Sequence, residues 1–132
     1  MSKVFIVNAP ARWNSGQQVM VPLDMAPAAE YGDLVYIFEG THRPPSGEPA
    51  YEHIRTAMND FTSDDYLVIV GDMDLVIWAA YVGLQVTDGK LRLLKWNNRT
   101  KAYDKVDAPP RYLLLDTVHH VLTYEATGET NG

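Results

Sequence analysis

Residues 64–85 constrain the fold of this chain more than any other stretch. They read DDYLVIVGDMDLVIWAAYVGLQ, an apolar run interrupted once by a Gly-Asp pair. Leu67 to Val70 form an unbroken aliphatic run, which is typical of a strand covered on both faces. The apolar run that begins at Asp74 is long enough for about three helical turns. The stretch therefore predicts a buried strand, a tight turn and a buried helix.

Similar runs elsewhere predict a single α/β domain. With 132 residues, 46% of them hydrophobic, the chain is suited to one core. We expect further strands at residues 3–7 and 33–39, and further helices at residues 24–31 and 49–61. Strands and helices that alternate in this order favour a parallel sheet with right-handed crossovers. The predicted fold is a three-layer, Rossmann-like open sheet that is mostly parallel.

The segment after the central helix predicts a β-hairpin. Leu91 to Trp96 and Ala102 to Val106 are two short runs joined by a polar turn at Asn97 and Asn98. We expect this C-terminal hairpin to lie at the edge of the sheet. It holds six of the 11 basic residues, so the sequence predicts a cationic edge.

Two segments show no long period. Residues 9–24 are rich in Pro, Gly, Asn and Ser and are expected to form a long loop, with a short extended piece at residues 18–21. The Ala-Pro-Pro sequence that starts at Ala108 indicates a boundary. We therefore expect an α/β domain at residues 1–108, an appended docking segment at 109–125 and a disordered tail at 126–132.

Composition excludes several classes of protein. The chain has no cysteine, so disulfides and thiolate metal sites are excluded. Its formal net charge of -6 argues against a general nucleic-acid binder. The apolar stretch at 66–86 contains two aspartates, and the first strand is too short for a signal peptide. We therefore expect a cytoplasmic protein without a membrane partner.

The carboxyl ends of the predicted strands define the best candidate ligand site. Ligands of open parallel sheets bind at that edge, where successive loops converge. The side chains that follow the three strands there are Asn8, Arg12, Trp13, Glu39, Asp72 and Asp74. Turn and helix-capping preferences account for the same residue types without any ligand.

The helix that follows Gly71 is a poor phosphate site by sequence. A phosphate cradle needs several glycines with free amides at a helix N-terminus, and Gly71 stands alone. Asp72 and Asp74 would repel a phosphate and are expected to cap the helix. The alternative is that Glu39, Asp72 and Asp74 hold Mg²⁺, which prefers oxygen ligands. Apart from this alternative, no cofactor is expected.

The hairpin supplies a candidate interaction surface. Its exposed residues are expected to be Arg92, Trp96, Arg99 and Tyr103. Aromatic rings among cations bind single-stranded nucleic acid by stacking and charge, but lysines also commonly protect edge strands. Tyrosine, tryptophan and arginine are equally typical of protein interfaces.

The chain shows no pattern typical of a catalytic site. His119 and His120 are adjacent and so point in different directions, with only Asp116 at ligand spacing nearby. The serines lie outside any nucleophile-elbow pattern. The sequence therefore leaves enzymatic activity undecided and favours a protein without one.

Four stretches together resemble a known group of viral proteins. They are KVFIVN, PAAEYGDLVY, DDYLVIVGD and LRLLKWNNRTKAY, spanning residues 3–107. They resemble a group of small accessory proteins of unassigned activity that tailed bacteriophages encode. The resemblance implies an accessory protein of the bacterial host cytoplasm and identifies no functional residue.

The preferred interpretation is a non-enzymatic interaction protein, a phage-type accessory protein or a modulator of a host or phage complex. Its partner would be another protein or a second copy of the chain. One alternative is a small nucleotide-binding or Mg-dependent nucleotide-processing domain. The other is a self-assembling structural protein.

Overall fold

A computed structural model describes residues 2–8, 11–22, 24–39 and 47–107, with only the backbone described at 11–13 and 20–22. The elements in chain order are β1 (Lys3–Asn8), β2 (Ala11–Asn14), β3 (Val19–Pro22), the 3-10 helix η1 (Ala26–Tyr31), β4 (Asp33–Phe38), α1 (Glu48–Ala57), β5 (Tyr66–Val68), α2 (Met73–Val86), β6 (Arg92–Asn97) and β7 (Ala102–Asp107). The expected segments at 109–125 and 126–132, with His119 and His120, lie outside the described residues.

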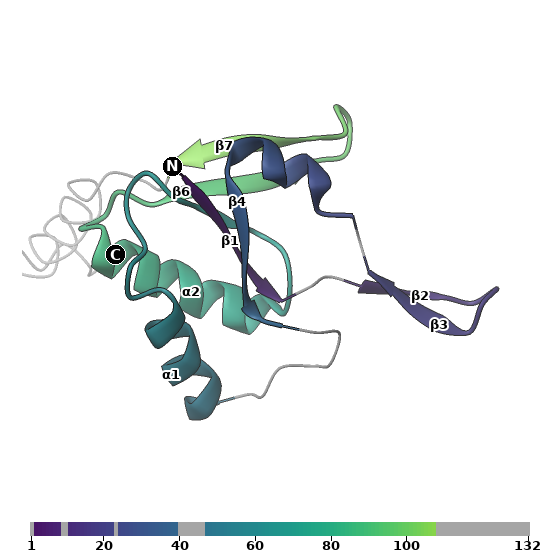
Figure 1. Ribbon diagram of the computed structural model, residues 1–132, viewed down its shortest axis with the longest axis horizontal. Helices are drawn as coiled ribbons and strands as arrows, with labels where there is room; N and C mark the ends of the chain where they lie inside the picture. The colour runs from purple at the N-terminus through teal and green to yellow at the C-terminus, as the bar shows by residue number, and fades with distance from the viewer. Residues whose placement is uncertain (1, 9–10, 23, 40–46, 108–132) are drawn as a thin grey trace, which may run out of the picture.

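The main sheet has five strands in the order β4-β1-β5-β6-β7 (Figure 1). β4, β1, β5 and β6 are parallel, and β7 runs antiparallel to β6 at the edge. The prediction of a mostly parallel open sheet with a C-terminal hairpin at its edge is confirmed. The central strand is shorter than expected, because the regular pairing of β5 ends at Val68, and only Ile69 donates one further bond to Leu94.

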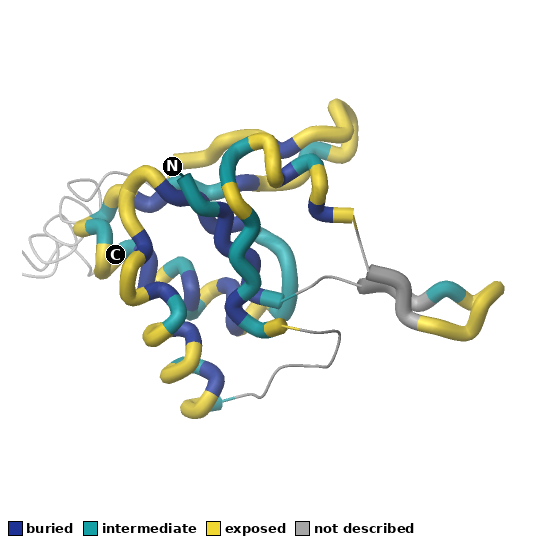
Figure 2. Tube along the Cα trace, viewed as in Figure 1, coloured by how far each residue is buried: buried dark blue, intermediate teal, exposed yellow. Residues whose placement is uncertain are grey.

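Successive side chains of β1 point to opposite faces of the sheet, so the core is divided between the two faces. Phe5 and Val7 pack with α1 and α2 on one face, while Val4 and Ile6 pack beside η1 on the other. All four side chains are buried. Figure 2 shows the buried residues running through β1 and along the sides of α1 and α2 that face the sheet.

The direction of each crossover determines which face its helix covers. The chain moves from β4 to β5 through α1 and from β5 to β6 through α2, and both helices lie on one face. It moves the opposite way from β1 to β4, and η1 lies on the other face. Crossovers between parallel strands are right-handed, so a crossover that runs in the opposite direction along the sheet places its helix on the opposite face. Within the described residues, the third layer therefore consists of one short 3-10 helix.

The prediction of a helix at 24–31 was right in place but wrong in type and start. η1 begins at Ala26, after Asp24 accepts a hydrogen bond from the Ala26 amide at 2.9 Å. It ends at Gly32, where an added Cβ would lie 2.3 Å from the carbonyl oxygen of Ser2.

The prediction for residues 9–24 was right about the short extended piece at 18–21, which corresponds to β3, but wrong about the long loop, because β2 pairs with β3 in a second, two-stranded sheet. β2 and β3 pair antiparallel, with Ala11 opposite Pro22 and Asn14 opposite Val19. The Asn14 side chain accepts hydrogen bonds from the amides of Gly16 and Gln17, which closes the turn. The hairpin extends away from the main sheet (Figure 1).

The prediction that the central helix is buried was wrong for one of its sides. Leu75, Ala79 and Val82 are buried against the sheet. Ile77 is 65% exposed and Tyr81 is 51% exposed on the opposite side. After Asp74 the helix has no charged residue that would indicate its outer side, so its sequence alone suggested burial on all sides.

A buried carboxylate ties the start of β1 to the loop before β5. Of the charged side chains that the structure describes, only Asp65 is buried, at 4% exposed. It accepts hydrogen bonds from the Lys3 amide at 2.9 Å, from the Thr62 amide at 2.8 Å and from the Thr62 hydroxyl at 3.0 Å. These bonds compensate the carboxylate for its lost hydration.

We predict that Asp65→Ala lowers the free energy of unfolding by about 2–4 kcal/mol, because it leaves two amides without their acceptor. The loss is measured as a shift in the midpoint of urea unfolding, with the dependence of the unfolding free energy on urea concentration unchanged. Asp64→Ala is the matched control, because the Asp64 side chain is exposed. It should change stability by less than about 0.5 kcal/mol. Equal losses in both variants would contradict the role of Asp65.

Candidate functional sites

The carboxyl ends of β1 and β5 meet at the point where the chain changes direction across the sheet. From β1 the chain goes on to β4 on one side, and from β5 it goes on to β6 on the other. Open α/β sheets bind ligands at such a switch point. Of the six predicted rim residues, the structure brings Asn8 and Asp72 into contact here.

Asn8 occupies the position that an anion would need at the start of α2. Its Oδ1 accepts a hydrogen bond from the Asp72 amide at 3.0 Å. Gly71 has φ 115° and lies so close that an added Cβ would be 2.3 Å from the same oxygen. Because the side chain of Asn8 already uses this amide, the contact joins β1 to α2 and leaves one donor fewer for a phosphate.

The capping expectation for the two aspartates is only half met. Asp72 is the N-cap residue by position, but its side chain makes no capping hydrogen bond. Asp74 lies in the first turn, where a carboxylate interacts favourably with the helix dipole. Both carboxylates keep the start of α2 negative.

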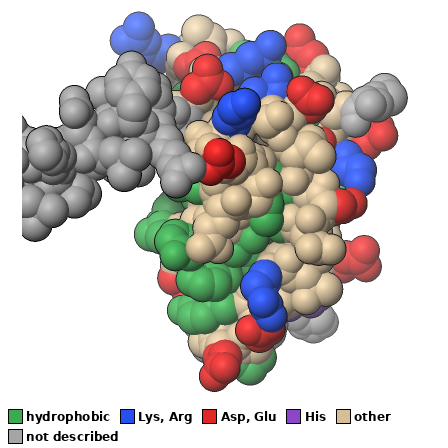
Figure 3. All heavy atoms as spheres, turned by 90° about the vertical axis from the view of Figure 1, so that its left-hand side faces the viewer, with side chains coloured by type: hydrophobic (Ala, Val, Ile, Leu, Met, Phe, Trp, Pro, Cys, Tyr) green, Lys and Arg blue, Asp and Glu red, His purple; other side chains and the backbone are tan. Residues whose placement is uncertain are grey.

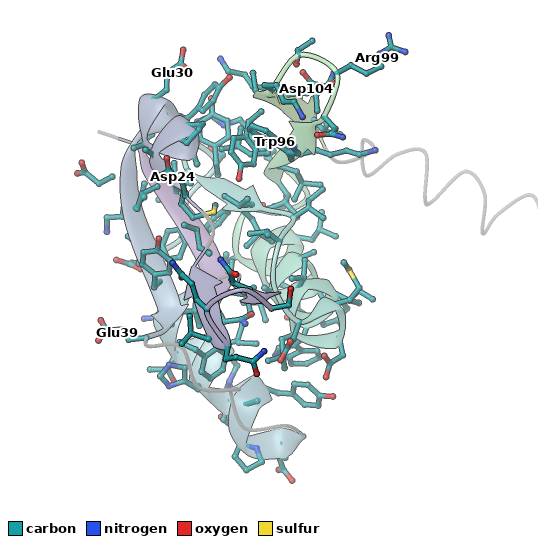
Figure 4. All side chains as sticks on the ribbon, turned by 90° about the vertical axis from the view of Figure 1, so that its right-hand side faces the viewer. Asp24, Glu30, Glu39, Trp96, Arg99 and Asp104 are labelled. Carbon is teal, nitrogen blue, oxygen red and sulfur yellow. The ribbon has the colours of Figure 1, made fainter. Side chains whose placement is uncertain are left out.

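The remaining rim residues do not join this contact. Glu39 is exposed after β4 and points away from the sheet (Figure 4). Arg12 and Trp13 belong to β2, and their side chains lie outside what the structure describes. Over the described residues there is no group of three acidic or histidine side chains that could hold a metal ion. Glu39, Asp72 and Asp74 therefore do not form the Mg²⁺ site considered from the sequence.

An exposed apolar surface follows α2 on its outer side. We call it the α2 stripe, and its residues are Tyr51, Met73, Ile77, Trp78 and Tyr81. Met73, Ile77 and Tyr81 are spaced four apart and all exposed, and Figure 3 shows hydrophobic side chains gathered over this helix. A groove with a volume of about 290 Å³ runs along the stripe, and Asp74 is the one charged side chain among the described residues of its lining.

The aromatic rings of the α2 stripe are held in place by one another. The Trp78 indole N–H donates to the Tyr51 carbonyl oxygen at 3.1 Å, and the two rings lie 5.0 Å apart. Tyr81 stacks on Trp78 at 5.4 Å. These contacts order the rings before any partner binds, which lowers the entropy cost of binding.

The predicted interaction surface on the hairpin is only partly exposed. The guanidinium of Arg92 lies 3.9 Å from the centre of the Tyr66 ring and donates to the Asp64 carbonyl oxygen. Arg99 is exposed at the tip of the hairpin and points outward (Figure 4). Tyr103 is buried. Arg92 and Tyr103 therefore support the fold of this edge in addition to any part in binding.

The charge of the hairpin is more balanced than its lysines suggested. Asp107 lies opposite Arg92 in the strand register, and Asp104 lies opposite Lys95. Opposite charges at directly paired positions attract one another across the strands. The edge therefore offers a weaker positive field than the count of basic residues implied.

A second cavity, which we call the rim pocket, lies beside the hairpin on the η1 face. Its volume is about 260 Å³, and it is lined by Asp24, Met25, Val70, Trp96 and Tyr103. Val70 follows β5 and Trp96 is near the end of β6, so the pocket is at the same carboxyl edge as the switch point. Trp96 and Tyr103 were predicted interaction residues, while the sequence analysis missed Asp24, Met25 and Val70 as site residues.

Tyr103 forms the inner wall of the rim pocket. Its hydroxyl donates to the Met25 sulfur at 3.7 Å, and its carbonyl oxygen accepts a bond from the Tyr31 hydroxyl at 3.0 Å. Burial raises the pKa of Tyr103 above its ordinary value, and the neighbouring Tyr36 adds to the effect. The wall is therefore neutral at physiological pH.

The family of the chain follows from a comparison with known proteins. A family model described as "Phage Pam3 gp32-like protein" matches residues 2–110. The chain belongs to this family. Searches among curated proteins and among solved structures found no match.

Membership in the phage Pam3 gp32-like family confirms the phage-type resemblance seen over residues 3–107. The matched region contains the whole main sheet, the α2 stripe and the rim pocket. In the described part of this family member, no helix is long and apolar enough to cross a membrane. The family description names no ligand or reaction, and the two candidate surfaces are the α2 stripe and the rim pocket.

We predict that Gly71→Ala destabilises the fold by about 1–3 kcal/mol, because alanine disfavours this φ and its Cβ would meet Asn8. Asn8→Ala alone should cost about 1 kcal/mol through the lost hydrogen bond. Asn8→Ala also removes the atom that the new Cβ meets. The double variant should therefore be more stable than the sum of the two losses predicts, by about 0.5 kcal/mol or more. Urea unfolding of the wild type, the two single variants and the double variant measures this coupling. Strictly additive losses would contradict the close contact between Gly71 and Asn8.

Proposed function

We propose that this member of the phage Pam3 gp32-like family is a non-enzymatic accessory protein of the host cytoplasm that binds a protein partner through the α2 stripe. The observation that carries the proposal is the exposure of Met73, Ile77 and Tyr81 on a helix with no charge between Leu75 and Val86. Soluble proteins seldom expose a contiguous apolar helix face unless another surface covers it.

The composition of the stripe supports a protein as the partner. Trp78 and Tyr81 are the residue types that carry most binding energy in protein interfaces. The groove beside them is open to solvent and is lined by apolar and aromatic side chains of α2, which suits the apolar face of an amphipathic helix. Full burial of one large aliphatic side chain such as Ile77 stabilises a complex by about 1.5–3 kcal/mol.

The charges around the stripe support a partner with basic residues. Asp74 lines the groove, no described cation does, and Asp72 adds a second carboxylate at the same helix end. Lysine or arginine residues beside the apolar face of the partner helix would meet these carboxylates. Such complementarity raises the association rate and selects the orientation of the partner.

The switch point supports this assignment over the nucleotide-binding alternative. Asn8 already accepts the hydrogen bond of the Asp72 amide, and the two carboxylates of the first turn disfavour an incoming phosphate. The α2 stripe, by contrast, favours binding, because exposed apolar surface is unfavourable in water and a bound partner would cover it.

We predict that Ile77→Lys weakens partner binding about tenfold or more, since it places a cation in the groove and removes apolar contact. The partner is captured from a lysate of infected host cells and purified, and its Kd for the full chain is then measured by calorimetry. Val86→Lys is the matched control on the same helix, because Val86 is 44% exposed and does not line the groove. Its Kd should stay within about twofold.

Three results would count against the proposal. The first is a partner whose Kd is the same for the wild type and for Ile77→Lys. The second is the absence of any stoichiometric partner. The third is a dimer by light scattering that Ile77→Lys abolishes, because the stripe would then bind a second copy of the chain. Melting temperatures of both variants close to that of the wild type ensure that the comparison concerns binding.

A further inference from the structure

We propose that the rim pocket binds an organic cation, an alkylammonium or guanidinium group, between the Trp96 ring and the Asp24 carboxylate. This site is independent of the α2 stripe, which lies on the other face of the sheet. Its described lining consists of two aromatic rings, one thioether, one aliphatic side chain and one carboxylate, with no cation among these described residues. This combination attracts positive charge and apolar carbon at the same point.

Trp96 supplies the aromatic face. It is 41% exposed, although it is a large hydrophobic residue that is paired with β7 near the end of β6. Its ring is fixed edge-on against Tyr103 at 5.1 Å, directly opposite in the strand register. Tryptophan binds cations more strongly than tyrosine or phenylalanine because its ring carries the largest negative potential on its face.

The same face of the sheet already binds two cations of this chain by aromatic rings. Arg92 lies 3.9 Å from the centre of the Tyr66 ring, and Lys105 lies 5.5 Å from the centre of the Tyr31 ring. Among the described residues, no lysine or arginine takes a corresponding place over Trp96. Unlike the rings of Tyr66 and Tyr31, the Trp96 ring is therefore open to a cation from outside the chain.

Asp24 supplies the countercharge. One of its oxygens accepts the Ala26 amide at 2.9 Å, which holds the carboxylate beside the pocket. It forms no ion pair with any described lysine or arginine. Asp24 and Trp96 belong to the lining of one pocket, and Figure 4 shows both in the part of the molecule that holds η1 and the hairpin. A cation in the pocket would meet both the ring and the carboxylate.

The size of the pocket limits the ligand to a small group. A volume of about 260 Å³ is below the range of about 300–1,000 Å³ that is usual for drug-sized ligands. It suits one ammonium or guanidinium group with its adjoining carbons. Such a group has two sources, a free amine in the cell or a lysine or arginine side chain of a partner protein.

The test is an NMR titration of the full chain that follows the indole N–H signal of Trp96, assigned with Trp96→Phe. The free-amine probes are choline and its neutral carbon analogue 3,3-dimethyl-1-butanol. The side-chain probes are N-acetyl-lysine amide and its neutral analogue N-acetyl-norleucine amide. We expect each cation to shift the Trp96 signal and each neutral analogue to do so at least about fivefold more weakly, as for a partly desolvated cation–π contact. The tighter of the two cations identifies the source.

Two variants separate the charge from the fold. Asp24→Asn removes the charge and keeps an oxygen that can accept the Ala26 amide, and it should weaken cation binding about fivefold. Asp104→Asn is the matched control, because it removes the same charge from an exposed hairpin position outside the pocket lining. It should leave the affinity within about twofold.

The outcomes are decisive in each direction. Cation-selective shifts that Asp24→Asn weakens and Asp104→Asn does not would support the proposal. Equal shifts by the cations and their neutral analogues would overturn it, because the pocket would then recognise apolar volume alone. Absence of any Trp96 shift, or equal weakening by both aspartate variants, would also overturn it.

Discussion

The complete burial of β1 is the constraint on which the rest of the structure depends. Val4, Phe5, Ile6 and Val7 are each no more than 1% exposed, so every residue in the middle of this strand needs cover. β4 and β5 pair with its two edges, α1 and α2 cover one face, and η1 covers the other. The Asp65 carboxylate binds the Lys3 amide at one end of the strand, and Asn8 binds the start of α2 at the other.

The cover on the two faces is unequal, and both candidate surfaces result from this inequality. One face carries two α-helices, and the apolar composition of α2 exceeds what the sheet can bury. Its outer side becomes the α2 stripe. Among the described residues, the other face carries η1 alone, a helix of six residues, and the ends of β5 and β6 are incompletely covered by it. The rim pocket lies in that uncovered region.

The two surfaces use different chemistry and lie on opposite faces of the sheet. The α2 stripe presents an ordered row of apolar and aromatic side chains with a negative end, which suits an amphipathic helix. The rim pocket presents one tryptophan and one carboxylate, which suits a single positive group. A protein of the phage Pam3 gp32-like family with both surfaces could contact two groups at once without competition between them.

The sequence by itself determined the strands of the main sheet, their mostly parallel direction and the edge hairpin, but not the order of the strands. Unbroken aliphatic runs such as Leu67 to Val70 have few alternatives to a central strand, and the Asn97 turn joins two strands locally. It also indicated the correct edge of the sheet for Asn8 and Asp72, because this edge follows from strand direction alone. The hairpin at residues 11–22 was missed because its strands are short and its turn is closed by one side chain, Asn14.

Only the tertiary structure decided which side chains meet. An apolar helix has no polar side, so nothing in its sequence distinguished the buried Leu75 from the exposed Ile77. Asp24 and Trp96 are separated by most of the chain, and only the crossover of η1 onto the second face brings them into one pocket. Local patterns determine backbone conformation, whereas sites are assembled by contacts between distant residues, whose positions depend on how the layers pack.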